Sequence, residues 1–311
     1  MPYVTGIANS AADLCNAVVS LATDHGWRWD NSNHILCKGD INGQLTSSDC
    51  NLLVQLAIGY SGNTLVSPAP QKTGITDRLG YAGNTLLSYP LTYHIFVHTA
   101  PDEIIVAVNY QLMWWQWLAL GQANSFGVLG NAVWQWGSTT SDMKIQAGIA
   151  LNVDGSSSGG YYGHTSGAPF WQPNDGSGVP NSSIYLNVNG HGWWNNSVGY
   201  YSANPNNARA SITAAPLLMT QPNAWNGEAV LIRLHIMVAQ PSNFWSLAAE
   251  LPHLRMLRND YISDGQILTI GAERWFIAPV YRKNTVSRST SAYKDATHSG
   301  TIAIAVRYDG P

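Results

Sequence analysis

The chain has few charged residues, and this shortage excludes several classes of protein. Only 11% of its 311 residues are Asp, Glu, Lys or Arg, whereas an average soluble domain has roughly 25%. The formal net charge is −3, and the basic residues are scattered, so the sequence predicts no nucleic-acid-binding surface. A chain with so little charge is expected to cover part of its surface with a partner.

Cysteine pairs and long hydrophobic segments are also missing. Cys15, Cys37 and Cys50 match no zinc or redox spacing, so we expect free thiols in a protein made in a reducing cytoplasm; a Cys37–Cys50 disulfide is the alternative. No run of about 18 apolar residues occurs, which predicts no membrane span. The first residues lack a basic segment, so no secretory signal is predicted.

The usual catalytic and cofactor motifs do not occur either. The sequence has no GxSxG elbow, phosphate-binding loop, HExxH pair or dinucleotide fingerprint. His94 and His98 share one face of an expected strand but lie about 13 Å apart, so we interpret them as ordinary polar or interface histidines. Asp102 and Glu103 follow Pro101 and are interpreted as a solvated charge pair on a turn. We therefore expect no catalytic residue, metal or cofactor.

Aromatic residues are abundant, with 13 Trp and 15 Tyr. The chain contains WWQW at 114–117 and WQW at 134–136. Because alternate residues of a strand face opposite sides, bulky rings on both sides of 114–117 predict a strand covered on both faces. Such rings pack in a core, in a subunit interface, or against sugar rings. The interface or glycan-stacking candidates are Trp114, Trp115, Trp117, Trp134, Trp136, Trp171, Trp193 and Trp194.

Hydrophobic periodicity predicts one helix followed mainly by strands. Residues 10–25 have a cap at Ser10, apolar residues at helical spacing and a stop at Gly26. Short β-branched or aromatic runs predict strands at 52–58, 93–98, 104–110, 114–120, 184–188, 229–238, 244–247, 267–270, 275–281 and 301–308. This pattern predicts a mainly β fold, an antiparallel sandwich or barrel-like sheet, with one amphipathic helix near the N-terminus.

The stretch 152–226 differs from the rest of the chain. It is dense in Gly, Ser, Asn and Pro but also carries many aromatic rings, which a flexible linker does not need. We interpret it as a long aromatic-rich loop insertion, ordered by its own rings or by a partner. Residues 1–151 and 227–311 would form the β-rich body; a solvated linker at 152–226 is the alternative.

Charged residues gather near the C-terminus, within and beside apolar strands. They suggest a buried network of ion pairs that sets strand or subunit register; solvent-exposed charges on turns are the alternative. The candidates are Glu250, Arg255, Arg258, Asp260, Arg274 and Arg282, with Asp309 beyond them.

Several segments together resemble a family of structural proteins from the tail-gene region of tailed bacteriophages. These segments are 250–260, 265–271, 273–275, 279–285, 298–301 and 307–311, with 6–14 and 115–122 nearer the N-terminus. The resemblance implies a virion component of the tail tip or baseplate, without an enzymatic role, assembled in the host cytoplasm. Head–tail joining and capsid decoration remain open.

The composition points in the same direction as the resemblance. Low charge, many aromatics and β-rich patterning are typical of a subunit in a symmetric homo-oligomer that also contacts other tail proteins. The alternative is a carbohydrate-binding or receptor-binding tail protein that stacks host glycans on exposed Trp and Tyr rings. A cell-wall hydrolase ranks last, because no pair of acids is marked by its sequence context.

Overall fold

Antiparallel strands form almost all of the described structure. The computed structural model describes residues 2–76, 87–127, 130, 132–140, 184–188, 192–195, 225–239, 245–288 and 298–311. Within these ranges the only helix is α1 (Ala11–Asp24), near the N-terminus. The predicted mainly β fold with one N-terminal helix is therefore confirmed.

Helix α1 begins and packs as its sequence predicts. The Ser10 side chain accepts a hydrogen bond from the Asp13 amide at 3.0 Å, and the Asp13 carboxylate accepts one from the Asn9 amide at 3.1 Å. This reciprocal arrangement satisfies amides that a helix start leaves unpaired. Leu14 and Val18 lie on the buried face, and the helix packs against strands of both sheets.

The larger sheet contains twelve strands and curls over on itself. Its first limb consists of β1 (Tyr3–Ala8), β8 (Leu91–His98), β9 (Glu103–Tyr110), β10 (Trp114–Ser125), β11 (Ala132–Gly137), β13 (Ile184–Val188) and β14 (Trp193–Asn195). Its second limb consists of β15 (Ile232–Ala239), β16 (Trp245–Arg258), β19 (Ile302–Arg307), β18 (Glu273–Pro279) and β17 (Ile267–Ile270).

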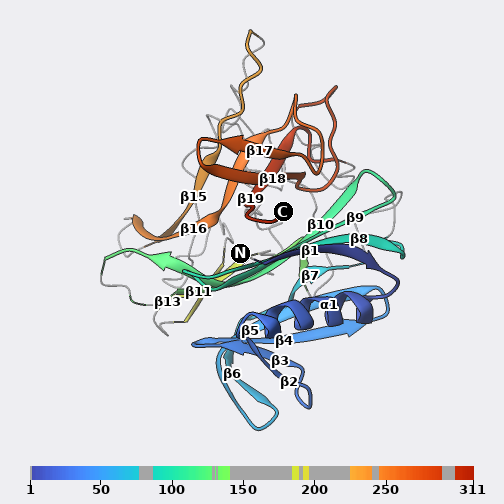
Figure 1. The fold of residues 1–311 in the computed structure, drawn as a ribbon. Helices are drawn as coiled ribbons and strands as arrows, with labels where there is room; N and C mark the ends of the chain where they lie inside the picture. Colours follow the sequence, from blue (N-terminus) through green and yellow to red (C-terminus); the bar gives the residue numbers. More distant parts are fainter. Residues whose placement is uncertain are drawn as a thin grey trace, which may run out of the picture.

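Within the described ranges, the strand ladder passes from one limb to the other through a short pairing of β10 with β16. Asn124 and Ser125 at the end of β10 pair with Glu250 and Ala249 of β16. The sheet turns over at this point, so the second limb lies above the first as half of a barrel (Figure 1). Strands β13 and β14 fall inside the stretch 152–226, most of which lies outside the described residues.

A smaller sheet lies on the opposite side of the first limb. It contains β2 (Arg28–Asp30), β3 (Ile35–Lys38), β4 (Ile41–Ser48), β5 (Asn51–Ser61), β6 (Thr64–Pro68), β7 (Thr73–Ile75) and β12 (Thr139–Thr140). Helix α1 runs between this sheet and the first limb (Figure 1). The described residues therefore form three β layers, namely the second limb, the first limb and the smaller sheet, with α1 between the last two.

The first limb is buried on both faces. On β9, Ile105 and Ala107 belong to a core between the two limbs, here called the inter-limb core. Ile104, Val106 and Val108 point the other way into a core shared with α1 and the smaller sheet, here called the inter-sheet core. Double coverage explains why this strand is continuously apolar rather than alternating.

The cysteines and the helix bear on two sequence predictions. Cys15, Cys37 and Cys50 all lie in the described ranges and form no disulfide, so the alternative Cys37–Cys50 bridge is wrong. Among the described residues, no helix has the length and apolar character needed to cross a membrane.

Candidate functional site

Most of the candidate tryptophans are core residues of the single chain. Five of the eight expose 6% of their surface or less: Trp114, Trp115, Trp117, Trp134 and Trp136. Trp115 and Trp117 lie in the inter-limb core and Trp114 lies in the inter-sheet core, as expected for a strand covered on both faces. The structure therefore places these rings in the core, where neither a glycan nor a second subunit reaches them.

The other three tryptophan candidates differ. Trp193 and Trp194 on β14 are partly exposed, and the indole nitrogen of Trp193 donates to the Ser67 carbonyl at 2.8 Å. Trp171 lies outside the described residues. Of the eight candidates, only Trp193 and Trp194 are seen to keep part of a ring at the surface.

The glutamine in each tryptophan motif joins the first limb to the smaller sheet. The Gln135 Oε1 atom accepts from the Leu56 amide at 2.6 Å, and its Nε2 donates to the Gln71 carbonyl at 2.9 Å. Leu56 lies where β5 changes partners, because Ala57 pairs with β6 and Val54 with β7. The Gln135 amide thus occupies a gap in the sheet and bonds its backbone.

Gln116 makes an equivalent connection one strand away. Its Oε1 accepts from the Thr76 amide at 2.9 Å, and its Nε2 donates to the Thr76 carbonyl at 2.8 Å. Gln116 and Gln135 are both fully buried, and buried amides of this kind need all their partners. The only signal in the sequence was a polar residue between tryptophans in an apolar strand.

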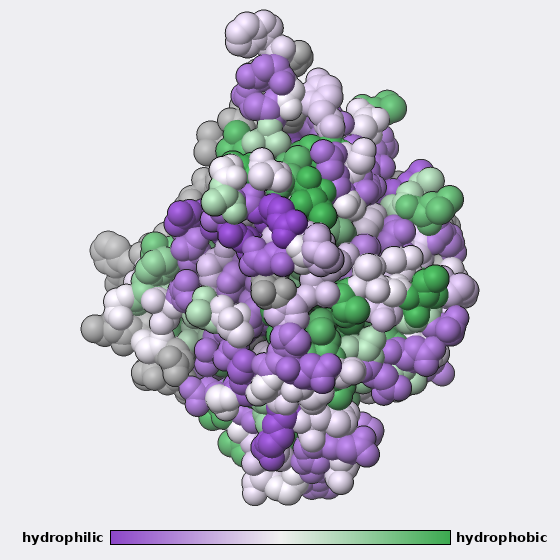
Figure 2. Space-filling view, in the orientation of Figure 1, coloured by the Kyte–Doolittle hydropathy of each residue, from purple (hydrophilic) through white to green (hydrophobic). Residues whose placement is uncertain are grey.

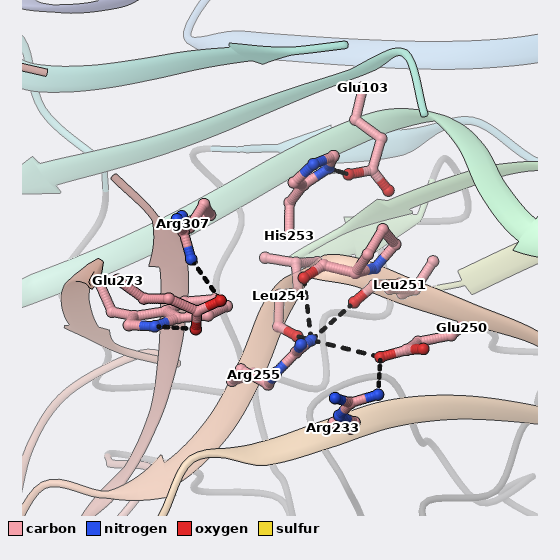
Figure 3. Close-up of polar contacts among 11 residues, drawn as sticks. Glu103, Arg233, Glu250, Leu251, His253, Leu254, Arg255, Glu273 and Arg307 are labelled. Atoms are coloured by element: carbon pink, nitrogen blue, oxygen red, sulfur yellow. Dashed lines mark hydrogen bonds and ion pairs between the residues drawn. The ribbon is translucent and has the colours of Figure 1, made fainter. Parts of the chain in front are cut away.

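A bulge in β16 directs His253 toward Glu103 of the first limb, while Arg255 lies beside the bulge near Glu250 (Figure 3). Arg233 of β15 pairs with Arg255, but the next residue, Leu234, pairs with Leu251. Residues 252–254 therefore have no counterpart in β15. The Arg255 Nη1 atom donates to the carbonyls of Pro252 at 2.9 Å and Leu254 at 2.8 Å, and so satisfies carbonyls that the bulge removes from the ladder.

The bulge directs His253 toward a buried carboxylate in the first limb. Its Nδ1 lies 2.5 Å from Glu103 Oε2, although the residues are 150 positions apart in sequence. The other carboxylate oxygen accepts from the Trp134 indole at 3.2 Å. The Glu103 side chain is completely buried, whereas 15% of the His253 side-chain surface is exposed.

The interpretation of Glu103 as a solvated turn residue is wrong. Only Asp102 behaves as a surface charge, pairing with Lys38 at 2.8 Å. Glu103 is the first residue of β9 and faces the inter-limb core opposite Gly121. A Cβ on Gly121 would lie 2.7 Å from the Glu103 Cα and 2.5 Å from the Asp102 carbonyl, so glycine is required there.

His98 completes the cluster by stacking on His253. The ring centroids are 4.0 Å apart with an interplanar angle of 13°. His98 is 1% exposed, and neither ring nitrogen has a hydrogen-bond partner within the described chain. His94, four residues earlier on β8, is not part of this cluster. It forms a hydrogen bond with the Tyr3 hydroxyl at 2.9 Å instead.

Burial controls the protonation of this cluster. Desolvation holds the pKa of His98 well below its usual value, and the neighbouring His253 adds to this effect. Desolvation also raises the pKa of Glu103, while the hydrogen bond and charge of His253 oppose the rise. Burial and the nearby His253 both destabilise the protonated form of His98, so its surroundings favour a neutral ring.

The chemistry of the cluster is that of an oriented imidazole. A carboxylate that binds Nδ1 holds a histidine in one tautomer, as in general-base dyads. In the described ranges, however, no hydroxyl or thiol bonds to His253, and no three His, Cys, Asp or Glu side chains are grouped to hold a metal. The contacts seen are those of a polar connection between the two limbs of the larger sheet.

The predicted C-terminal charge network divides into separate local clusters. Glu250 lies 3.7 Å from Arg255 and 3.6 Å from Arg233. Arg307, which the sequence interpretation omitted, pairs with Glu273 at 2.7 Å. The guanidinium groups of Arg255 and Arg307 lie 5.0 and 5.6 Å from the centre of the Trp275 ring, a geometry typical of cation–π contacts.

The remaining members of the predicted network also have local partners. Arg258 is 3% exposed and donates to the Arg288 carbonyl at 2.7 Å, and its burial lowers its pKa to about 10. Asp260 pairs with the Arg288 side chain at 2.5 Å. The guanidinium groups of Arg274 and Arg282 lie over the rings of Tyr308 and Trp114.

Comparison with known proteins adds no family. No protein-family model matches the chain, and no curated protein matches it. The resemblance to phage tail proteins therefore stays a prediction.

Proposed function

We propose that this chain is a structural subunit of a tailed-bacteriophage virion that acts by protein–protein assembly. The observation that carries the proposal is the tip of the β9–β10 hairpin. Leu112 is 91% exposed there and Met113 is 45% exposed. In Figure 2 a small hydrophobic area covers this end of the hairpin, at the right of the molecule.

The backbone of this tip argues against a merely tolerated exposure. Gln111 has a φ of 47° and Leu112 a φ of 71°, values that favour Gly or Asn and cost other residues about 1–2 kcal/mol each. The Asn109 side chain donates to the carbonyls of Leu112 and Trp114, which holds the turn in place. A strained, preformed and apolar tip suits insertion into a neighbouring subunit.

Replacing Leu112 with glycine separates stability from assembly. Glycine relieves the backbone strain, so we expect the free energy of unfolding to stay the same or rise by up to about 1 kcal/mol. Sedimentation velocity of the purified chain is expected to show fewer oligomers than wild type. Val286→Ser is the matched control, because Val286 is 95% exposed on another loop and should leave assembly unchanged.

The outcomes of this experiment are decisive for the proposal. Normal assembly by Leu112→Gly would exclude the hairpin tip as the contact. A wild-type chain that stays monomeric and is missing from purified particles by mass spectrometry would overturn the structural role itself.

The position in the particle rests on the sequence resemblance, which supports the tail tip or baseplate. Gold-labelled antibody against this chain, imaged on purified tailed particles, tests it. Label at the distal tail end is expected. Label at the capsid or neck would keep a virion role and refute the tail position.

A glycan-binding tail protein remains the second candidate, because Trp193 and Trp194 keep partly exposed rings. Their fluorescence should then change when host surface polysaccharide is added, and Trp194→Ala should reduce the change. Fluorescence unaffected by polysaccharide would eliminate this candidate.

A further inference from the structure

The Glu103–His253–His98 cluster is a polar junction between the apolar faces of the two limbs. His98 and Glu103 are cross-strand neighbours at the end of the β8–β9 hairpin, and His253 reaches them from the β16 bulge. The inter-limb core beside them is formed by aliphatic and aromatic residues such as Phe96, Trp134 and Leu254. The cluster thus adds a polar side-chain contact to the apolar packing and the short β10–β16 pairing between the limbs. At the other end of β10, the Trp115 amide donates to the Tyr281 carbonyl at 2.7 Å and the Trp117 indole donates to the Pro279 carbonyl at 3.0 Å.

His98 is a buried polar side chain without a hydrogen-bond partner among the described residues. Both nitrogens of His98 are buried, and neither has a hydrogen-bond partner in the described ranges. A neutral imidazole tolerates this as an aromatic ring stacked on His253. A protonated imidazole would be a buried cation lying face to face with a second imidazole.

The charged groups facing His98 also act on its protonation. The neighbouring His253, the positive charge of Arg307 on β19 and that of the chain's amino terminus all disfavour an imidazolium at His98. Glu103 is the cross-strand partner of His98, but its carboxylate is already bonded to His253 and Trp134. Asp102 beside it is paired with Lys38. Neither of these two carboxylates is therefore unpaired and available to neutralise a protonated His98.

We propose that the Glu103–His253–His98 cluster is an acid-sensitive lock between the two limbs of the larger sheet. While His98 is uncharged, its stack on His253 holds the β8–β9 hairpin against the β16 bulge. On acidification His98 takes up a proton, its buried imidazolium finds no hydrogen-bond acceptor among the described residues, and the limbs separate at this end. The inference is independent of the assembly role proposed above.

The sign of the pH effect follows from linkage. The folded state depresses the pKa of His98 below its usual 6.5, so above pH 6.5 both folded and unfolded states hold a neutral ring and the stability is fully present. Below pH 6.5 the unfolded state binds a proton that the locked state rejects, and stability falls. One such group changes the unfolding equilibrium constant by up to tenfold per pH unit.

The test is His98→Phe, which keeps an aromatic ring for stacking and removes the titration. We expect the unfolding equilibrium constant of wild type, measured in urea, to rise as the pH falls from 7.5 to 5. Below pH 6.5 the constant of His98→Phe should rise less steeply than that of wild type, by a factor of up to ten per pH unit. His34→Asn is the control, because exposed His34 has a φ of 54° that asparagine accepts. Equal pH slopes for wild type and His98→Phe would refute the lock.

Hydrogen exchange on the unmodified chain tests the same inference if the variant fails to fold. Amide protection factors at pH 5 and 7.5 are compared for β8, β9 and β16 and, as internal reference, for β3, β4 and β5 in the smaller sheet. The lock predicts that protection at pH 5 falls first in β8, β9 and β16. A parallel fall in both groups, or no fall in the first, would overturn it.

Discussion

Replacing Gln135 with leucine is expected to weaken the contact between the first limb and the smaller sheet. Leucine has a similar size, so the change removes the amide without opening a large cavity. The Leu56 amide, which is buried, loses the acceptor it contacts at 2.6 Å, and the Gln71 carbonyl loses a donor at 2.9 Å. The Thr73 hydroxyl loses a further contact at 3.2 Å.

The expected loss of stability follows from these contacts. A buried group left without its hydrogen bond costs about 1–3 kcal/mol. The Leu56 amide carries the largest part, because it sits between the partners of β5 and has no strand beside it to take over. Adding the weaker losses at Gln71 and Thr73, we expect Gln135→Leu to lower the free energy of unfolding by about 2–4 kcal/mol.

Urea denaturation followed by tryptophan fluorescence and circular dichroism measures this loss. The matched control is Gln44→Leu, because Gln44 is only partly buried and makes one contact, to the Asn33 carbonyl at 3.2 Å. The control should lose less than about 1 kcal/mol. If Gln135→Leu is no less stable than Gln44→Leu, the amide is not what joins the two sheets, and the reasoning fails.

Three further predictions concern the larger sheet. Arg255→Met removes the donor to both bulge carbonyls, so we expect about 1–3 kcal/mol lower stability in urea. Gly121→Ala would drive a Cβ into the Glu103 backbone and should lower the melting temperature far more than Gly59→Ala, where the added Cβ meets nothing within 4 Å. Burial lowers the pKa of His94 to about 4, so stability should be lost as pH falls below 6.5; His94→Phe should flatten that loss in pH-dependent melting.

Local sequence signals predicted the elements whose cause is local. The cap at Ser10 and the apolar spacing of Leu14 and Val18 were enough to locate α1, because a helix start is decided by neighbours along the chain. Long apolar runs likewise predicted β9 and β10. The short strands β3 and β4 were not predicted, since four to eight residues with polar insertions carry little periodicity.

Other assignments failed because the deciding contact is remote. Glu103 follows a proline and an aspartate, which is typical of an exposed turn, yet its side chain meets His253, 150 residues away. The tryptophans drew attention as surface candidates, yet double coverage of the first limb buries five of them. No sequence pattern announces which polar residue will face a second sheet.

The amino-acid sequence by itself determined the class of this protein: charge-poor, aromatic-rich and mainly β, with one capped helix. These properties follow from composition and from periods of two and 3.6 residues, which neighbours along the chain already define. Tertiary structure alone decided that Gln116, Gln135, Glu103 and His253 connect layers. A buried polar group is stable only where a hydrogen-bond partner is in place. The partners of these residues come from strands that are brought together by the curling of the larger sheet and by its packing on the smaller one.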